Sequence, residues 1–372
     1  MKFLFNNASV FHWQHLQKAG LLSFFLTTSF GMFSQEKPQD STKLETLDEV
    51  LVRSVRVQAD SPITHSNLSK EEIEQRNLGQ DIPILLNFLP SVVTTSDAGA
   101  GVGYTGIRVR GINAQSTNVT INGIPYNDAE SLGTFWVNLN DFASSVESLQ
   151  LQRGVGTSTN GSGAFGASIN VLTDAVSNDA YGEFANSFGS FNTRKHTLKF
   201  STGLLNDRVE FAGRLSNIKS DGYIDRASSD LKSYFLQGSY KSANTLIKAI
   251  TFSGKEITYQ SWNGLEDLEK LENDRTYNTA GEYTDENGNT QFYENEVDNY
   301  QQDHYQLHWN QRYDNNWSTN MAFNYTAGRG YFEQFKEDAE FADYGLNEIV
   351  IATDTISETD LVRRRWLDND FY

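Results

Sequence analysis

The fold is decided by four blocks that read Arg108-Val-Arg-Gly-Ile-Asn113, Thr120-Ile-Asn-Gly-Ile-Pro-Tyr-Asn127, Val146-Glu-Ser-Leu-Gln-Leu-Gln-Arg-Gly-Val-Gly156 and Gly161-Ser-Gly-Ala-Phe-Gly-Ala-Ser-Ile-Asn-Val-Leu172. Each block holds a short alternating apolar run next to glycine, which is typical of half-buried strands joined by tight turns. Such strands predict a small compact domain.

Local signals in this region predict turns and helices. Asn122-Gly123 lies between two apolar runs, where both residues can adopt the positive φ of a tight hairpin turn. Ser69-Lys-Glu-Glu72 has the pattern of a capping box at a helix start. The segment 81–90 predicts a second short helix, with one proline in its first turn and another after its last. We therefore expect an α+β domain over residues 55–175.

The order of these blocks resembles the plug domain of TonB-dependent outer-membrane receptors. The likeness covers roughly residues 46–175. Its motif positions are Arg110, Gly111, Asn122, Gly123, Pro125, Arg153, Gly154, Gly163 and Gly166. A phosphate-binding loop is the alternative use of these glycines, but no Gly-Lys-Ser/Thr follows them, so a nucleotide site is not expected.

Composition limits the possible functions. The 372 residues include no cysteine, which excludes disulfides and Cys-ligated metal. Seventeen Tyr, 24 Phe and six Trp against five Pro favour a β-rich protein. A net charge of −18 argues against a nucleic-acid partner, because neutralising phosphates requires clustered Lys and Arg.

The N-terminal region carries targeting and partner signals. Residues 1–34 have cations before a short apolar run, as in an export signal that is cleaved near Ser34. Residues 35–54 form a polar segment that ends in a short apolar run, 46–54. Next to a plug-like domain, this run resembles the TonB box, which implies that the energy-coupling protein TonB pairs with it by β-augmentation. The residues concerned are Thr46, Leu47, Asp48, Glu49, Val50, Leu51 and Val52.

Two loops of the plug domain are candidates for ligand contact, since apical plug loops touch the ligand in this family. They span residues 96–104 and 126–136. Their candidate contact residues are Tyr104, Tyr126, Asp128, Glu130, Phe135 and Trp136. The alternative for Phe135 and Trp136 is packing against the barrel wall, because large aromatic residues mostly serve packing.

Beyond residue 175, the pattern changes to runs of about ten residues, as transmembrane β-barrel strands require. In the segment 303–310, Tyr305, Leu307 and Trp309 alternate with polar residues; in 208–217, Phe211 and Leu215 alternate with Glu210 and Arg214. One face suits lipid and the other a wet interior. A soluble β-sandwich also alternates, but its outer face would be polar. We therefore expect antiparallel barrel strands over residues 180–372.

The connections between these runs differ in length. Residues 204–207, 241–244 and 313–316 predict tight turns, whereas 260–297 and 331–359 predict long acidic loops outside the cell. About eight strands are expected, fewer than the roughly 22 of a barrel that encloses a plug. The sequence therefore predicts an incomplete barrel, and thus an N-terminal fragment.

No catalytic or metal site is predicted, and no cofactor. His304 and His308 share a strand face, but no ligand spacing of a known metal site accompanies them, so polar lining is the better interpretation. Asp128 and Glu130 have nothing to mark them as a catalytic acid and base. We expect a protein that is not an enzyme.

The resemblance implies a function in the cell outer membrane. It implies active import of a scarce extracellular ligand, driven by TonB, with a metal chelate, most commonly an iron-siderophore complex, as cargo. Haem, cobalamin and oligosaccharide remain as other ligands. In the family, receptors that import oligosaccharides usually carry an extra domain before the TonB box. The segment from Gln35 to Glu45 is too short for such a domain, which argues against oligosaccharide as the ligand. A surface adhesin or a passive pore is the alternative of a different class. Outer-membrane lipid is the expected surrounding.

Overall fold

The computed structural model describes residues 56–57, 61–156, 165–314 and 316–372. The predicted export signal, the TonB-box-like residues Thr46–Val52 and Gly163 lie outside the described residues. Within those ranges, no helix is both long enough and apolar enough to cross a membrane.

The first part of the described chain contains a five-stranded sheet in the order β1-β6-β7-β4-β5. Its strands are β1 (His65–Ser69), β4 (Thr117–Ile121), β5 (Ile124–Pro125), β6 (Val146–Arg153) and β7 (Ala167–Thr173). Strands β2 (Val92–Ser96) and β3 (Thr105–Val109) form a separate antiparallel pair. Ile121 pairs with Ile124 across Asn122 and Gly123, whose φ values are 53° and 81°. The predicted tight hairpin is confirmed.

Short helices flank this sheet. Helix α3 (Lys70–Glu74) begins at Ser69 with the predicted capping box, in which Ser69 and Glu72 bond each other's backbone N–H groups. Helix α4 (Ile82–Leu85) is shorter than the predicted 81–90. After Leu85 the chain continues as turns, which place Leu86 and Leu89 in the core. The 3-10 turns η2 (Ala114–Ser116), η3 (Trp136–Leu139) and η4 (Phe142–Ser145) complete this part.

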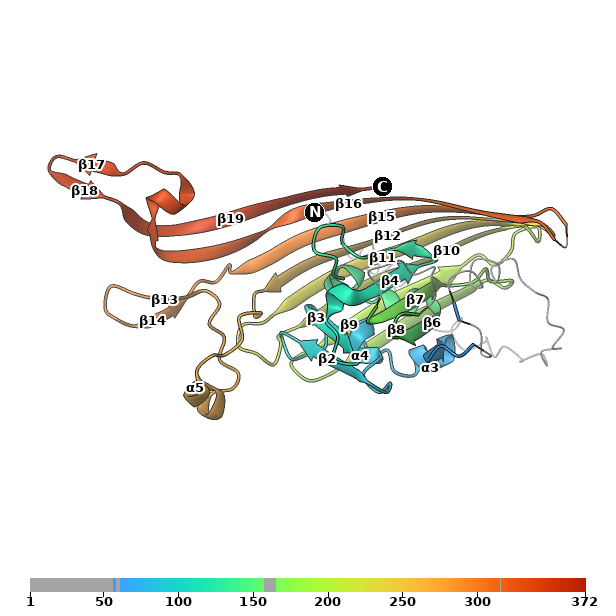
Figure 1. Ribbon diagram of the computed structural model, residues 1–372, viewed down its shortest axis with the longest axis horizontal. Coiled ribbons are helices and arrows are strands. Elements are labelled where there is room, and N and C mark those ends of the chain that lie inside the picture. Colours follow the sequence, from blue (N-terminus) through green and yellow to red (C-terminus); the bar gives the residue numbers. More distant parts are fainter. Residues whose placement is uncertain (1–55, 58–60, 157–164, 315) are drawn as a thin grey trace, which may run out of the picture. The chain divides into compact units, whose positions relative to one another are not determined.

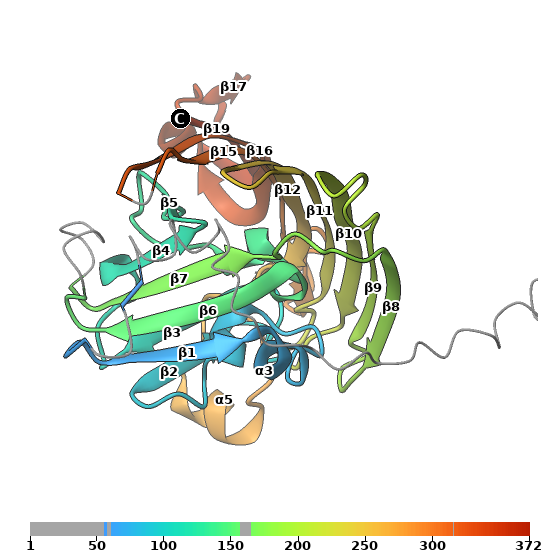
Figure 2. The ribbon, with the colours of Figure 1, turned by 90° about the vertical axis from the view of Figure 1, so that its right-hand side faces the viewer.

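The second part is an eight-stranded antiparallel sheet in the order β19-β16-β15-β12-β11-β10-β9-β8. This sheet thus has the expected number of about eight strands. It is open, and β8 and β19 are its two edges. The strands are β8 (Tyr181–Phe188), β9 (Arg194–Ser201), β10 (Val209–Ser220), β11 (Ser229–Lys241), β12 (Thr245–Tyr259), β15 (Val297–Arg312), β16 (Ser318–Glu340) and β19 (Glu358–Phe371). The sheet curves around the five-stranded sheet, which lies on its concave side (Figure 2). From here on, the eight-stranded sheet is called the wall, and the part of the chain before it is called the plug.

Burial alternates along the long strands in the sense opposite to that of a soluble protein. On β15, Tyr305, Leu307 and Trp309 are exposed, while His304 and His308 are buried. On β10, Phe211 is 54% exposed and Arg214 only 1%. The apolar side chains therefore point outwards and the polar ones towards the plug, as lipid on the outside requires.

One hydrophobic core joins the two parts. Phe142 of η4 lies 5.0 Å from Phe252 of β12 and 6.2 Å from Phe235 of β11, measured between ring centroids. All three are at most 2% exposed. Gly254 of β12 leaves space for the backbone of Asn138, because a Cβ atom there would overlap its carbonyl group. The plug thus packs directly on the wall.

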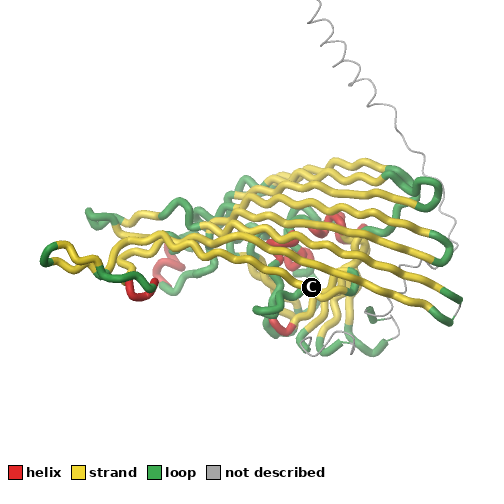
Figure 3. Tube along the Cα trace, turned by 90° about the horizontal axis from the view of Figure 1, so that it is seen from above, coloured by secondary structure: helices red, strands yellow, loops and turns green. Residues whose placement is uncertain are grey.

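Tight turns and long connections lie at opposite ends of the long strands (Figures 1 and 3). Residues 204–207 and 241–244 connect strands at one end, where residues 313, 314 and 316 also lie. The long connection after β12 contains α5 (Leu268–Asn273) and a hairpin of β13 (Glu282–Thr284) and β14 (Thr290–Phe292).

The prediction of a loop over residues 331–359 is wrong for residues 331–340, which belong to a strand. Strand β16 continues to Glu340, because its pairing with β19 extends beyond its pairing with β15. Only residues 341–357 connect β16 to β19, and they contain η6 (Phe341–Tyr344), β17 (Ile349–Ile351) and β18 (Asp354–Ile356).

Candidate functional site

Two cavities lie between the plug loop 126–136 and the wall. A cavity of about 370 Å³ is lined by Tyr104, Asp128, Glu130 and Phe135 from the plug and by Trp262 and Phe332 from the wall side. A second cavity, of about 240 Å³, is lined by Tyr126, Asp128 and Phe135 together with His304. Five of the six predicted contact residues therefore surround two adjoining cavities.

Tyr104 joins the plug loop 97–104 to the wall. Its hydroxyl donates a hydrogen bond to Asp298 of β15, and its ring meets Trp262 edge-on at 5.3 Å. Burial, and then the nearby carboxylates of Glu256 and Asp298, raise the pKa of Tyr104 well above its ordinary value. The phenol is therefore a neutral hydrogen-bond donor.

Tyr126 makes the equivalent contact in the smaller cavity. Its hydroxyl donates to Oε1 of Gln302 at 3.3 Å, and its ring lies 5.3 Å from that of His304. Burial raises the pKa of Tyr126. Both tyrosines thus hold the plug loops to β15 through hydrogen bonds from an uncharged phenol, which Tyr104 donates to a carboxylate and Tyr126 to an amide oxygen.

The neighbouring aromatic residues Phe135 and Trp136 have different environments. Phe135 is 46% exposed and lines both cavities. Trp136 is 2% exposed and belongs to the hydrophobic core. The burial of Trp136 is what the packing alternative expects, whereas Phe135 has surface to offer a ligand; the ligand role of both stays a prediction.

The two acidic candidates, Asp128 and Glu130, have different environments. Asp128 Oδ1 accepts hydrogen bonds from the backbone N–H groups of Glu130 and Ser131, at 3.1 and 2.6 Å, and so fixes the turn of its own loop. Glu130 is exposed and lines the larger cavity.

The motif residues of the plug serve its backbone. Arg110 and Gly111 have positive φ values of 54° and 75°. Arg153 donates to Ser66 Oγ at 2.9 Å and so ties β6 to β1. Gly154, with φ 98°, leaves space for the Arg110 guanidinium, and a Cβ atom at Gly166 would overlap Ile112 and the carbonyl of Ser116. Pro125 ends the hairpin in β5.

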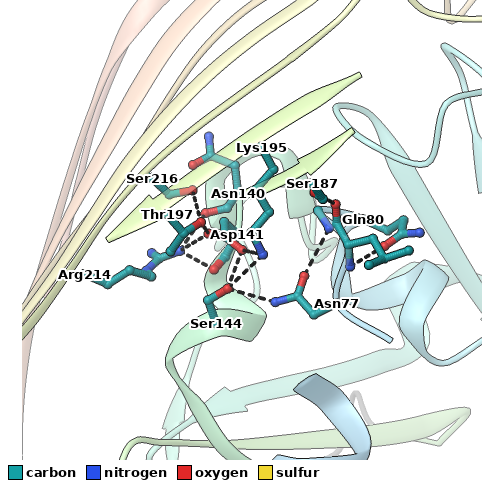
Figure 4. Close-up of polar contacts among 12 residues, drawn as sticks. Asn77, Gln80, Asn140, Asp141, Ser144, Ser187, Lys195, Thr197, Arg214 and Ser216 are labelled. Carbon is teal, nitrogen blue, oxygen red and sulfur yellow. Dashed lines mark hydrogen bonds and ion pairs between the residues drawn. The ribbon is translucent and has the colours of Figure 1, made fainter. Parts of the chain in front are cut away.

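A charged cluster of Asp141, Lys195 and Arg214 joins the plug to the wall elsewhere (Figure 4). Asp141 precedes η4 and takes the left-handed conformation, with φ 51°, which aspartate tolerates better than most residues. Its Oδ1 lies 2.7 Å from Lys195 Nζ on β9, and its Oδ2 lies 3.4 Å from Arg214 Nη1 on β10. The three side chains are at most 5% exposed.

Two hydroxyl groups donate further hydrogen bonds to the Asp141 carboxylate. Ser144 Oγ and Thr197 Oγ1 each donate to this carboxylate at 2.6 Å. Burial by itself would raise the pKa of Asp141, but Arg214 and Lys195 outweigh it and lower the pKa to about 2. The carboxylate is therefore charged throughout the physiological range.

A second group of ion pairs lies farther along the same face. Asp174 lies 2.7 Å from Lys70 Nζ and 3.6 Å from Lys199 Nζ of β9. Lys70 of α3 also pairs with Glu147 at 3.6 Å. Plug carboxylates and wall ammonium groups therefore match along β9.

The sequence did not single out these ion pairs as a site. The alternation of β10 did assign Arg214 to the polar inner face, but a wet interior was expected there. In the structure, this part of the inner face is buried and paired with the plug. Alternation identifies the face of a side chain but not its partner, so Asp141 gave no signal of its own.

The histidines of β15 line the wall. His304 stacks on Phe252 at 4.4 Å, lies 3.1 Å from Gln302 Oε1 and lies 2.9 Å from Thr326 Oγ1. His308 lies 3.2 Å from Gln306 Oε1. Over the part of the chain that the structure describes, no three His, Asp or Glu side chains are arranged to hold a metal ion.

Comparison with known proteins gives one family and two curated relatives. The TonB-dependent Receptor Plug Domain model matches residues 57–168, within the predicted bounds 55–175, which themselves stay a prediction. The chain is 27% identical to the "Probable TonB-dependent siderophore receptor PirA" of Acinetobacter baumannii, over 40% of the chain and 20% of that protein. It is 23% identical to the ferrienterobactin receptor of Escherichia coli, over 87% of the chain and 47% of that protein. The chain thus spans less than half of either relative.

Solved structures share the fold. The closed form of the ferric-catecholate import receptor Fiu of E. coli superposes with a TM-score of 0.58 at 16% identity, over 85% of the chain and 43% of that receptor. The siderophore receptor PirA of A. baumannii gives 0.55 at 16% identity, over 82% of the chain and 44% of that receptor.

Proposed function

We propose, from the premise that this chain is a TonB-dependent receptor of the outer membrane, that it takes part in the import of an iron-siderophore complex. The relatives named above are siderophore receptors, and a further neighbour of the same fold is a ferric citrate transporter. The observation that carries the proposal is the pair of cavities between the plug loops and β15.

These cavities have the properties of a ligand-recognition surface. They combine exposed aromatic groups with a small number of oriented polar groups, as binding pockets usually do. Trp262 and Phe332 belong to the end of the wall with the long connections. A ligand arriving from that end meets Phe135, Tyr104 and Trp262 before it reaches the core of the plug.

Ligand binding in these cavities would act on the plug through its two tyrosines. Tyr104 and Tyr126 hold the plug loops to Asp298 and Gln302. Such hydrogen bonds contribute only about 1 kcal/mol when the acceptor is an amide and about 1.5–3 kcal/mol when it is a carboxylate, so a ligand that engages either partner can replace them. Loosening of the loops is then the signal, and pairing of TonB with residues 46–52 supplies the pull.

The acidic lining gives the ligand a preferred charge. The carboxyl groups of Asp128, Glu130 and Asp298 border the larger cavity. Like charges at short distance in a partly desolvated site repel. We therefore expect a bound ferric chelate to turn a neutral or cationic side towards these acidic residues.

The test separates energised uptake from binding. Leu47→Pro or Val50→Pro removes a backbone donor from the segment and leaves the cavities unchanged, so uptake of radioactive iron as its enterobactin or citrate chelate should be abolished while binding in the cold persists. Ser41→Pro, in the preceding polar segment, is the matched control and should transport normally. Unchanged uptake in both variants would refute TonB-driven import and favour a pore or adhesin.

Ligand identity requires a second measurement. Expression of the protein and growth on ferric chelates under iron limitation should both depend on this chain if the cargo is an iron-siderophore complex. Indifference to iron would remove that ligand class and leave haem, cobalamin or oligosaccharide for direct binding assays.

A further inference from the structure

A row of polar residues crosses the outward face of the barrel sheet. Its members lie directly opposite one another in the strand pairing of six strands, from β9 to β16. They are His196, Asn217, Lys232, Lys255, Gln301 and Arg329. His196, Lys232, Lys255 and Arg329 are exposed. We call Lys232, Lys255 and Arg329 the cationic row.

The cationic row borders the apolar band of the same face. Towards the tight turns, the next outward residues are Leu198, Leu215 and Tyr234, and further apolar residues follow down to Val209. The strand segment Val209–Asn217 covers roughly 26 Å at about 3.3 Å per residue, and a tilt of about 40° reduces this to about 20 Å of membrane depth. The row therefore lies near the edge of the band, on the side of the long connections.

Two of these cations have no counter-charge within the described ranges of the chain. Arg329 pairs with Asp368 at 3.6 Å, and Lys219, one row further out, pairs with Asp230 at 2.7 Å. Lys232 and Lys255 lie directly opposite each other, and neither has an ion-pair partner among the described residues. Like charges in directly opposite positions destabilise a sheet. An external anion between them would relieve this repulsion.

The neighbouring acidic residue does not supply that anion. Asp303 lies one outward row closer to the band, opposite Ser253 of β12. Its two carboxylate oxygens accept from Gln301 Nε2 at 3.1 and 3.3 Å. Asp230 and Asp368 are held by Lys219 and Arg329. The carboxylates nearest the row are thus engaged elsewhere.

The surface is hollowed at this position. A shallow hollow of about 770 Å³ has Leu198, Leu215 and Tyr234 on one side and Lys219, Lys232 and Lys255 on the other. A second hollow, of about 570 Å³, adjoins it and shares Lys255. Apolar lining on the membrane side and ammonium groups on the outer side match the two ends of one amphipathic molecule.

We propose that this surface binds an anionic lipid of the outer leaflet, with its headgroup phosphate between Lys232 and Lys255 and an acyl chain along Leu198 and Leu215. Lipid is the source of the phosphate because the apolar half of the hollow offers nothing to a free ion and faces hydrocarbon. The site lies on the outer surface and is separate from the cavities of the proposed transport function.

The test is lipid binding by the full chain in non-ionic detergent, with phosphatidylglycerol and phosphatidylcholine as probes. Phosphatidylglycerol should bind more tightly, and this preference should weaken at high salt, which screens exposed charges. Each lysine near an anionic membrane surface contributes about fivefold to binding, so Lys232→Gln with Lys255→Gln should lower phosphatidylglycerol affinity by roughly 25-fold. Phosphatidylcholine affinity should not change.

The matched control removes two cations from the opposite end of the same wall. Lys241→Gln with Arg312→Gln lies at the tight turns, carries the same change in net charge and should retain the preference. Equal loss in both double variants, or an unchanged preference in the first, would overturn the proposal. Inorganic phosphate that competes as well as the lipid does would also overturn it, since the site would then bind a free ion.

Thermal stability gives an independent measurement. In lipid-free detergent, Lys232→Gln should leave the melting temperature unchanged or raise it, because it removes a repulsion. With phosphatidylglycerol added, the parent protein should gain more than the variant does. A destabilised variant without lipid would show that the lysine is structural, and the proposal would fail.

Discussion

The plug contacts the barrel wall in two places that differ in chemistry. At β9 and β10, the charged cluster of Asp141, Lys195 and Arg214 is buried, and its carboxylate also accepts hydrogen bonds from two hydroxyl groups. At β15, Tyr104 and Tyr126 donate hydrogen bonds to Asp298 and Gln302 beside two cavities. Breaking a buried ion pair costs about 3–5 kcal/mol, against about 1 kcal/mol for a hydrogen bond to an amide and about 1.5–3 kcal/mol for one to a carboxylate. The first contact fixes the plug, and the second can respond to a ligand.

Asp141→Asn should break the charged contact and produce the largest effect. Lys195 and Arg214 would remain buried without a counter-charge, so the free energy of unfolding should fall by about 3–5 kcal/mol. Equilibrium unfolding of the full chain in detergent measures this. Asp368→Asn is the control, because its pair with Arg329 is more than 70% exposed on both sides and should matter by less than about 1 kcal/mol. Equal effects would show that burial does not distinguish the two pairs.

The same contact predicts the response to acid. The pKa of Asp141 in the folded protein is about 2, below its ordinary value of 3.8. A depressed carboxyl pKa stabilises the fold above the unfolded value, and this stabilisation is lost as the pH falls from about 4 through 2. The stability difference between Asp141→Asn and the parent should therefore be constant from neutral pH to about 5 and shrink below 4.

The sequence predicted the strands better than the contacts between them. Alternation on β10 and β15 gave the correct outward and inward faces, because the period of two is a property of each strand alone. The turn at Asn122-Gly123 and the cap at Ser69 were equally local and equally predictable. The end of β16 was missed because it depends on pairing with β19, which no local pattern records.

The candidate site was predictable in part. Glycine-bounded loops with aromatic tips identified Tyr104, Tyr126 and Phe135, which do meet at the cavities. Trp136, the next residue, faces the core instead, since a 3-10 turn begins there and reverses the side chain's direction. Trp262 and Asp298 were not found, because loop and strand residues far apart in sequence converge only in the fold. The ligand roles of all these residues stay predictions.

Tyr104→Phe should weaken the contact with β15 by an intermediate amount. The change removes the hydroxyl that donates to Asp298 and keeps the ring against Trp262, so stability should fall by about 1.5–3 kcal/mol, as for a hydrogen bond to a charged group. Amide hydrogen exchange should accelerate in the plug loop 97–104 and remain unchanged around Asp141. Uniform acceleration over both regions would mean that the two contacts are not independent.

Phe135→Ala should have the smallest effect on stability and the clearest effect on ligand binding. The side chain is 46% exposed, so its loss should change the free energy of unfolding by about 1 kcal/mol or less, whereas Trp136→Ala, at 2% exposure, should cost about 3–5 kcal/mol. Because Phe135 lines both cavities, affinity for a ferric chelate should fall in the first variant even though the fold persists. The pair thus separates the surface that meets the ligand from the core beneath it. If Phe135→Ala binds the chelate normally while Tyr104→Phe does not, recognition depends on the hydrogen-bonded loop alone and the cavity aromatics serve only to fill space.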